Sequence, residues 1–342
     1  MVPQTVIGWD LGKASSYVTA TNRDTGEIIR EGKVPNTPAD IRAAVEGLPR
    51  PTRVVFEATG NWQATYEILE GQVDEMQMAH PLETKAIAHA RIKTDKIDAA
   101  TLAHLGRADL VPQSWIPPRE VRDLRELLRH RAFLVSLQTK VKNRLYTYLD
   151  KAGIVAPEVS DMFGKVGMVF LQTVSIREPY RFLMDRALSV YGSLHEEILV
   201  VSAKIRTLAK EDPRAALILP MRGMGPFSAM LILSEIGDIE RFPGPEQLVS
   251  YAGLCPSTYQ SGKSLRHGSI TKRGSKWLRW ILIEATIHYS RAGGRLGQFY
   301  QRMMRRKGVK VARVALAREL LHSIYWCLKK GVEYKEVFVR GQ

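Results

Sequence analysis

The sequence predicts an α/β domain at the N-terminus, followed by a chain that is mostly α-helical. Three short β patterns, at residues 6–11, 16–22 and 27–34, are joined by turn signals at Gly12-Lys13 and Asp24-Thr25-Gly26. Helix and strand patterns then alternate, at residues 38–48, 53–58, 61–70 and 76–79. Three hairpin-linked strands followed by alternating helix and strand is the order of a ribonuclease-H-like sheet. Doubly wound folds do not open with such a meander.

The pattern changes to long helices after Pro117-Pro118. Apolar residues recur seven apart in the first long helix, and at alternating four- and three-residue spacings in a later one: Leu127, Leu134, Val141 and Tyr148, then Leu194, Ile198, Val201, Ile205 and Leu208. Such seams are typical of an antiparallel or intermolecular coiled coil. We expect the segments 121–149 and 194–208 to pair between chains, which would make the protein a homo-oligomer, a dimer or a tetramer.

A third unit begins at Asp212-Pro213. Residues 219–242 predict a helix, a Gly-Met-Gly turn and a second helix. This is close to the helix-hairpin-helix pattern, whose turn amides bind a DNA phosphate, although a plain tight turn has the same residues. The sequence therefore predicts three domains: an α/β domain at 1–110, a helical coiled-coil linker at 111–211 and a mainly α-helical domain at 212–342.

The charge of the chain is concentrated near its C-terminal end. Lys and Arg number 50 against 35 Asp and Glu, which gives a net charge of +15. Between Gly262 and Arg318 there are 15 Lys or Arg and one acid, Glu284, so this stretch alone carries +14. A field of this kind predicts a polyanionic partner, nucleic acid rather than a membrane, and the alternative is a generally basic surface.

Cysteine content and hydropathy bear on the compartment. The two cysteines, Cys255 and Cys327, suit a reducing cytoplasm and exclude a disulfide scaffold or a cysteine zinc cage. No apolar run approaches the roughly 20 residues that a membrane span needs, and the N-terminus lacks a signal-peptide pattern. We therefore expect a cytoplasmic protein with no membrane partner.

Four carboxylates form a candidate metal site. Asp10 and Glu57 interrupt apolar runs at the ends of the first and fourth strands, and Asp95 and Asp98 lie on one face of a helix. Burying an acid at a strand end is costly unless it is paired or bound to a cation. All-oxygen ligands suit Mg²⁺, or Mn²⁺. Taken singly, each acid also has a structural explanation, as a turn cap, an ion-pair partner of Lys13 or a solvated helix start.

Residues 256–274 combine four serines, two threonines and four Lys or Arg with no acidic residue. This stretch is either a loop that only binds phosphate, or one in which a hydroxyl attacks phosphorus while the cations hold the strand. A serine is a poor nucleophile without a base, a metal or a polarised phosphate, and His267 is the nearest candidate base in sequence. Ser261 and Ser257 are the two candidate nucleophiles of this stretch.

Several motifs, in order, resemble the DEDD transposases of the insertion-sequence one-ten family, which are relatives of the Piv-type DNA invertases. The motifs are GWDLGK, FEATGNW, KTDKIDA, GMGPFSA, FPGPEQLVSYAGLCPS, QSGK and ITKRGSKWLR. They span nearly the whole chain, whereas the middle helices match only in general character. The resemblance implies a RuvC-like N-terminal domain with a ribonuclease H fold, a coiled-coil linker and a C-terminal transposase domain with a nucleophilic serine.

The resemblance also implies roles for individual residues. The four acids would be Asp10, Glu57, Asp95 and Asp98, and the serine would be Ser261. Relatives of this kind use a structured guide RNA, or bridge RNA, that pairs with target and donor DNA. The implied function is a transposase of a mobile insertion sequence that acts on double-stranded target and donor DNA at the bacterial nucleoid.

Two other functions remain open. The first is a metal-dependent, structure-selective nuclease, in effect a junction resolvase, in which only the carboxylates perform chemistry. The second is a non-catalytic nucleic-acid-binding protein whose acids are structural. Under every alternative a common set of cations is expected to contact nucleic acid: Lys13, Arg129, Lys140, Arg144, Lys263, Arg266, Lys272, Arg273, Lys276, Arg279, Arg305 and Arg306.

Overall fold

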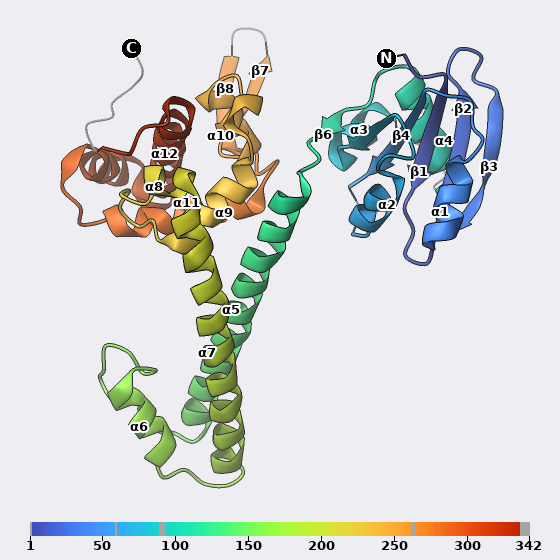
Figure 1. Ribbon diagram of the computed structural model, residues 1–342. Coiled ribbons are helices and arrows are strands. Elements are labelled where there is room, and N and C mark those ends of the chain that lie inside the picture. The colour runs from blue at the N-terminus through green and yellow to red at the C-terminus, as the bar shows by residue number, and fades with distance from the viewer. Residues whose placement is uncertain (1, 59, 89–93, 262–263, 336–342) are drawn as a thin grey trace. The chain divides into compact units, whose positions relative to one another are not determined.

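The computed structural model describes residues 2–58, 60–88, 94–261 and 264–335. The chain divides into two compact units, Met1–Pro117 and Pro118–Gln342 (Figure 1). The boundary coincides with the Pro117-Pro118 step at which the sequence pattern changes. The long helices and the C-terminal helices belong to one unit, and the division into three domains stays a prediction.

The first unit is built on a mixed sheet, which among its described residues has six strands in the order β3-β2-β1-β4-β5-β6. The predicted meander is confirmed, because β1, β2 and β3 are antiparallel neighbours. β4 and β5 run parallel to β1, and β6, which the sequence pattern did not predict, closes the far edge antiparallel to β5. The strands are β1 (Thr5–Asp10), β2 (Ser15–Asn22), β3 (Ile28–Pro35), β4 (Thr52–Glu57), β5 (Glu75–Ala79) and β6 (Gln113–Ser114).

Helices cover both faces of this sheet (Figure 1). Successive strand residues point to opposite faces, so each strand supplies two cores. Trp9 and Phe56 belong to a core that also contains residues of the first two helices, whereas Val6 and Val55 pack with Leu102 of α4 on the other face. The helices of this unit are α1 (Pro38–Val45), α2 (Trp62–Leu69), α3 (Pro81–Ile87) and α4 (Asp95–Arg107).

Helix α4 lies unusually close to strand β1. A β-carbon on Gly8 would collide with the carbonyl of Ala99 and the backbone nitrogen of Ala103, and one on Gly106 would crowd Val6 and Val55. Glycine is needed at Gly8 for space, because another residue would push the helix backbone away from the strand. The contact at Gly8 therefore determines how near α4 approaches the sheet.

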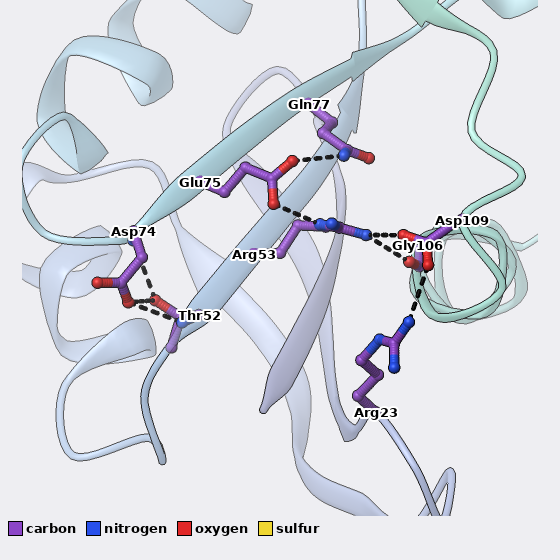
Figure 2. A network of polar contacts seen from close by, with 8 residues as sticks. All are labelled: Arg23, Thr52, Arg53, Asp74, Glu75, Gln77, Gly106 and Asp109. Carbon is purple, nitrogen blue, oxygen red and sulfur yellow. Dashed lines mark hydrogen bonds and ion pairs between the residues drawn. The ribbon is translucent and has the colours of Figure 1, made fainter. Parts of the chain in front are cut away.

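A polar network holds the C-terminal end of α4 (Figure 2). The guanidinium of Arg53, which is 8% exposed, donates to Glu75 at 2.7 Å, to the Gly106 carbonyl at 3.0 Å and to Asp109. Arg23 donates to the same Asp109 carboxylate at 2.8 Å. These hydrogen bonds from Arg53 and Arg23 lower the pKa of Asp109. One buried cation thus ties strands β4 and β5 to the end of α4.

The second unit begins with an arm of two long helices, α5 (Arg119–Lys151) and α7 (Tyr180–Glu211), which pack together beside the short α6 (Lys165–Thr173) (Figure 1). Leu128 and Ile205 are buried, and Val201 and Leu208 pack against their cluster. The two helices that carry the heptad seams therefore pack together within one chain, and pairing of these seams between chains stays a prediction.

The remaining helices form the largest core of the protein. It is centred on α9 and on the second half of α12, and it includes Ile232, Leu282, Leu320 and Tyr325. α12 is kinked at Gly308, whose φ of 80° lies outside the helical region. The elements are α8 (Pro213–Ile218), α9 (Pro226–Ile236), η1 (Ile239–Arg241), α10 (Pro245–Tyr251), β7 (Pro256–Ser261), β8 (Ser264–Ile270), α11 (Lys276–Ala285), η2 (Thr286–Tyr289) and α12 (Gly294–Lys330).

Cys255 and Cys327 are both free thiols, and burial raises the pKa of Cys327 to about 11. Within the described parts of the chain, every helix is too short or too polar to cross a bilayer.

The lowered pKa of Asp74 predicts how the stability of the first unit depends on pH in the acidic range. Hydrogen bonds from Arg50 and from the Thr52 amide lower the pKa of Asp74 to about 2, compared with roughly 3.9 in an unfolded chain. A lowered pKa stabilises the fold above pH 4, and this contribution should disappear as the pH falls from about 4 to about 2. We expect Asp74→Asn to flatten the dependence of the urea midpoint on pH in this window. Asp24→Asn, at an 88% exposed carboxylate, is the control, and equal effects of the two variants would contradict the prediction.

Candidate active site

Two of the predicted acids lie side by side at the sheet. β1 and β4 are parallel with Trp9 opposite Phe56, so Asp10 and Glu57 are level, one residue further along their strands. Val6 and Val55 face α4, and by alternation Asp10 and Glu57 point to the same face. Both side chains are half-buried. The topology therefore brings these two carboxylates together at the carboxyl ends of adjacent strands.

The other two acids begin the helix that covers this face. Thr94 is the N-cap of α4 and accepts a hydrogen bond from the Ile97 amide at 3.2 Å. Gly106 contacts Val6 and Val55, whereas Ala99 contacts Gly8, so α4 runs antiparallel to β1 and its N-terminal turn lies towards the Asp10 end. Asp98 is half-buried and Asp95 is exposed. Acids in a first helical turn are also favoured by the helix dipole, which gives them a structural role as well.

The loop after Asp10 is held by two asparagines that the sequence analysis did not single out. The side-chain amides of Asn36 and Asn61 both donate to the Gly12 carbonyl, at 2.8 and 2.6 Å. Asn61 lies within the FEATGNW motif, four residues after Glu57. The segment that follows β4 is thereby tied to the segment that follows β1. An Asn shortly after a strand-end acid is a signal that sequence reasoning could have used.

The four acids provide the type of ligand that a divalent metal ion prefers, but their side chains are not all grouped into one metal site. Carboxylate oxygens are the ligands that Mg²⁺ and Mn²⁺ prefer. Such an ion would also offset the negative charge of the two half-buried carboxylates at the strand ends. Among the residues that the structure describes, however, no three Asp, Glu, His or Cys side chains are grouped closely enough to hold a metal ion. The convergence of all four acids accordingly stays a prediction.

The stretch around Ser261 is a β-hairpin rather than the loop expected from the sequence. β7 and β8 are antiparallel, with Tyr259 opposite Arg266 and Ser261 opposite Ser264, and a register irregularity lies between Pro256 and Thr258. Ser261 is the last residue of β7, and β8 begins at Ser264. Ser257, the rival candidate, donates from Oγ to the Ser269 carbonyl at 2.9 Å, so its hydroxyl already takes part in the hairpin.

The base of the hairpin is pinned to the end of α10. The amides of Thr271, Lys272 and Ser275 donate to the carbonyls of Cys255, Gly253 and Tyr251. Gly253 and Gly274 both have positive φ, and a β-carbon on either would collide with a backbone carbonyl of the facing segment. The motif glycines thus allow two backbone segments to touch, which orients the hairpin on the helical core.

A buried carboxylate lies beneath this base. Glu235 of α9 is 3% exposed. Its Oε1 accepts from Arg129 of α5 at 3.0 Å, and its Oε2 accepts from the Oγ of Ser275, the N-cap of α11, at 2.9 Å. Arg125 lies 3.7 Å from Oε2 and also donates to the Ser234 carbonyl at 2.9 Å. Glu235 therefore joins the arm, α9 and the segment that ends the hairpin, a role that the sequence analysis missed.

The predicted nucleic-acid-binding cations fall into two groups. Arg129 pairs with Glu235, and Arg279 donates to the Ala252 carbonyl at 2.8 Å, so these two serve the fold. Lys263 lies outside the described residues. The others are exposed and suited to contact phosphates: Lys13, Lys140, Arg144, Arg266, Lys272, Arg273, Lys276, Arg305 and Arg306. Six of these nine lie on the hairpin, at or just before the start of α11, or on α12, whereas Lys13 lies in the first unit and Lys140 and Arg144 lie on α5.

Comparison with known proteins agrees with the order of these elements. A family model for a DEDD transposase of the IS110 type matches residues 7–154, and a model described as the transposase IS116/IS110/IS902 family matches residues 215–301, together more than half of the chain. A probable family 20 transposase of Pseudomonas aeruginosa is 26% identical, covering 96% of this chain and 98% of its own. A putative transposase, y4qE, of Sinorhizobium fredii is 24% identical over 83% of this chain and 71% of its own. The pilin gene-inverting protein of Moraxella bovis is 26% identical over 81% and 80%.

Removing the Glu235 carboxylate should loosen the base of the hairpin. We expect Glu235→Ala to lower the local stability of α9 and α11 by about 3 kcal/mol, because the partly buried guanidinium groups of Arg125 and Arg129 lose this carboxylate. Glu235→Gln, which keeps an acceptor for Ser275, should lose less. Hydrogen exchange of the backbone amides in these helices measures the effect directly. Glu246→Gln, at a 58% exposed carboxylate paired with Arg318, should cost less than about 1 kcal/mol, and an equal loss there would contradict the prediction.

Proposed function

Because the chain belongs to the IS116/IS110/IS902 family of transposases and is therefore a DNA transposase or recombinase, we propose that it cuts and rejoins DNA strands through Ser261 and the carboxylates Asp10, Glu57, Asp95 and Asp98. The observation that supports this best is the level placement of Asp10 and Glu57 on adjacent parallel strands, under the helix that begins at Asp95. The proposed domains are a RuvC-like domain at 1–110, the helical linker at 111–211 and the serine-bearing transposase domain at 212–342.

The four carboxylates would hold the divalent metal that the DEDD family suggests, Mg²⁺ or Mn²⁺. When bound, such an ion supplies charge stabilisation at phosphate oxygens and lowers the pKa of a coordinated hydroxyl. The protein's own contribution is to hold the acids in place. Gly8 lets α4 lie on the sheet, Thr94 caps its first turn, and Asn61 ties the loop after Asp10.

The covalent step involves the hydroxyl of Ser261. Its oxygen forms a bond to phosphorus, the bond to one strand's oxygen breaks, and that strand leaves as an alcohol that takes up the serine proton. Attack by a hydroxyl of the incoming strand then restores the serine and joins the DNA. Exposed Arg266, Lys272 and Arg273, on and beside the hairpin, are suited to neutralise the phosphate as charge develops. This assigns a chemical role to the combination of hydroxyls and cations in residues 256–274.

The proposed partners are double-stranded target and donor DNA and a structured guide RNA that pairs with both. A guide moves sequence specificity from side chains to base pairing, so the protein needs mainly phosphate contacts. This agrees with the net charge of +15 and with the exposed cations on the hairpin, at the start of α11 and on α12. The protein would act as a dimer or tetramer, because recombination must hold two DNA partners together.

The second candidate function is a RuvC-like nuclease without a serine step. It is favoured by one observation, namely that Asp10 and Glu57 are already level on the sheet while the hairpin lies in the other unit. A trapping experiment distinguishes the two functions.

We expect the wild-type protein and Ser257→Ala to form a protein–DNA adduct on a nicked suicide substrate whose released strand diffuses away. Ser261→Ala and Asp10→Ala should both fail, by at least about 100-fold, because each removes a reacting group. Denaturing gels with labelled DNA detect the adduct, and mass spectrometry locates it. A Ser261→Ala protein that cleaves at the wild-type rate without an adduct would identify the nuclease instead.

The carboxylates and Ser261 lie in different units, and we expect the active site to combine the carboxylates of one protomer with the serine of another. Mixing inactive Asp10→Ala with inactive Ser261→Ala should then restore a fraction of the adduct, because some sites receive both intact groups. Each variant mixed with itself is the control. An active wild type whose two variants never complement each other would show that each protomer carries a complete site.

A further inference from the structure

A chain of aromatic rings and guanidinium groups connects α5, α9 and α11 within the second unit. The ring of Phe227, at the start of α9, lies 6.4 Å from that of Trp280, and Trp280 lies 5.8 Å from Trp277, both in edge-to-face arrangements. The guanidinium of Arg131 lies 4.4 Å from the Phe227 ring, and that of Arg129 lies 5.9 Å from the Trp277 ring. The two end members of the aromatic group are therefore each covered by an arginine of the arm.

Trp280, the middle ring, is the most exposed of the three. It is 41% exposed, whereas its helix neighbours Leu278 and Ile281 are buried and Trp277 is half-buried. A tryptophan side chain is held here by two aromatic neighbours and still presents a large apolar surface to water. Rigid aromatic groups with one open side are the usual platforms on which nucleobases stack.

The charges around Trp280 favour a polyanion. Lys276 lies one turn earlier on the same helix face, and Lys272 and Arg273 precede the helix; all three are exposed. At the other end of α11, Gly223 comes so close that a β-carbon on it would crowd Ala285 and His288, which places the neighbouring exposed Arg222 beside that end. Glu284, one turn after Trp280, is the acid on this face.

We propose that Trp280, supported by Phe227 and Trp277, is a stacking site for an unpaired base of single-stranded DNA. A base in a duplex has both faces covered by its neighbours, so an aromatic side chain stacks most readily on an unpaired base of a single strand. Lys276, about 6 Å away along the helix axis, is placed to hold a phosphate of the same strand. DNA is the occupant because strand transfer by this family acts on DNA, and cutting and exchange expose unpaired bases.

This site is independent of the proposed serine step. Strand binding at Trp280 requires neither Ser261 nor the carboxylates, so it can be measured with inactive protein and without cleavage. A failure of the adduct experiment therefore leaves this inference untouched, and the reverse also holds.

The test uses the full-length Ser261→Ala protein and measures its affinity for a fluorescent oligo-dT strand and for a duplex of equal length. We expect Trp280→Ala and Trp280→Leu to weaken binding of the single strand about tenfold, because stacking on an aromatic ring is lost. Trp280→Phe should stay within a few-fold of the parent. Binding of the duplex should be the same for all. Ile287→Ala, at a 43% exposed apolar residue just beyond α11, is the matched control and should change neither affinity.

Other outcomes overturn the proposal. Equal losses on single strand and duplex would reduce the site to a general phosphate contact. If Trp280→Leu binds the single strand as tightly as the parent protein, the surface at Trp280 is an apolar docking surface and not a stacking site. Tighter binding of an RNA strand than of DNA, lost in the same variants, would assign the site to RNA. Because Trp280→Ala can also disturb folding, photocrosslinking of a 5-bromouracil strand to the unmutated residue provides a second measurement. Crosslinks that avoid the segment 276–285 would reject the site.

Discussion

The contact between α4 and strand β1 at Gly8 is the constraint on which the candidate carboxylate site depends. It allows the helix backbone to rest on the strand backbone, and any side chain at Gly8 would separate them. Since Asp10 is two residues further along the strand and Asp98 is one residue before Ala99, the separation of strand and helix sets the separation of their acids. Arg53 holds the opposite end of α4 through the Gly106 carbonyl. The acids are thus positioned by a steric contact near them and by a polar anchor about one helix length away.

In the second unit, a buried charged residue positions the segment next to the candidate nucleophile. Glu235 accepts hydrogen bonds from Arg129 and Ser275, and the segment that contains Ser275 ends the hairpin that carries Ser261. A carboxylate buried without partners would be costly, so the arginines that pair with it take part in holding the fold. The strong positive charge of this unit is consequently divided between cations that hold the helices and cations that face solvent.

Sequence reasoning predicted the first unit well, because its signals are local. Alternating apolar residues and turn glycines identified the meander, and the strand-end acids followed from it. It was less complete where one segment meets another. The heptad seams were read correctly as apolar stripes, but a period cannot tell an intramolecular partner from an intermolecular one, and α5 packs on α7 of the same chain. The run of Ser, Thr, Lys and Arg in 256–274 suggested a loop, although backbone pairing made it a hairpin. The role of Glu235 could not be predicted from the sequence, because its hydrogen-bond partners are more than 35 residues away along the chain.

The same distinction applies to the cations of α5. A basic side chain on an amphipathic helix has the same sequence signature whether it meets a phosphate, a buried carboxylate or an aromatic ring. Arg129 meets Glu235, Arg131 lies over Phe227, and both are consumed by packing between the arm and the helical core. That packing in turn leaves Trp280 as the open member of a rigid aromatic group. The arginines of the arm therefore cover one side of the aromatic cluster. The side that they leave uncovered is the surface available to a nucleic-acid strand.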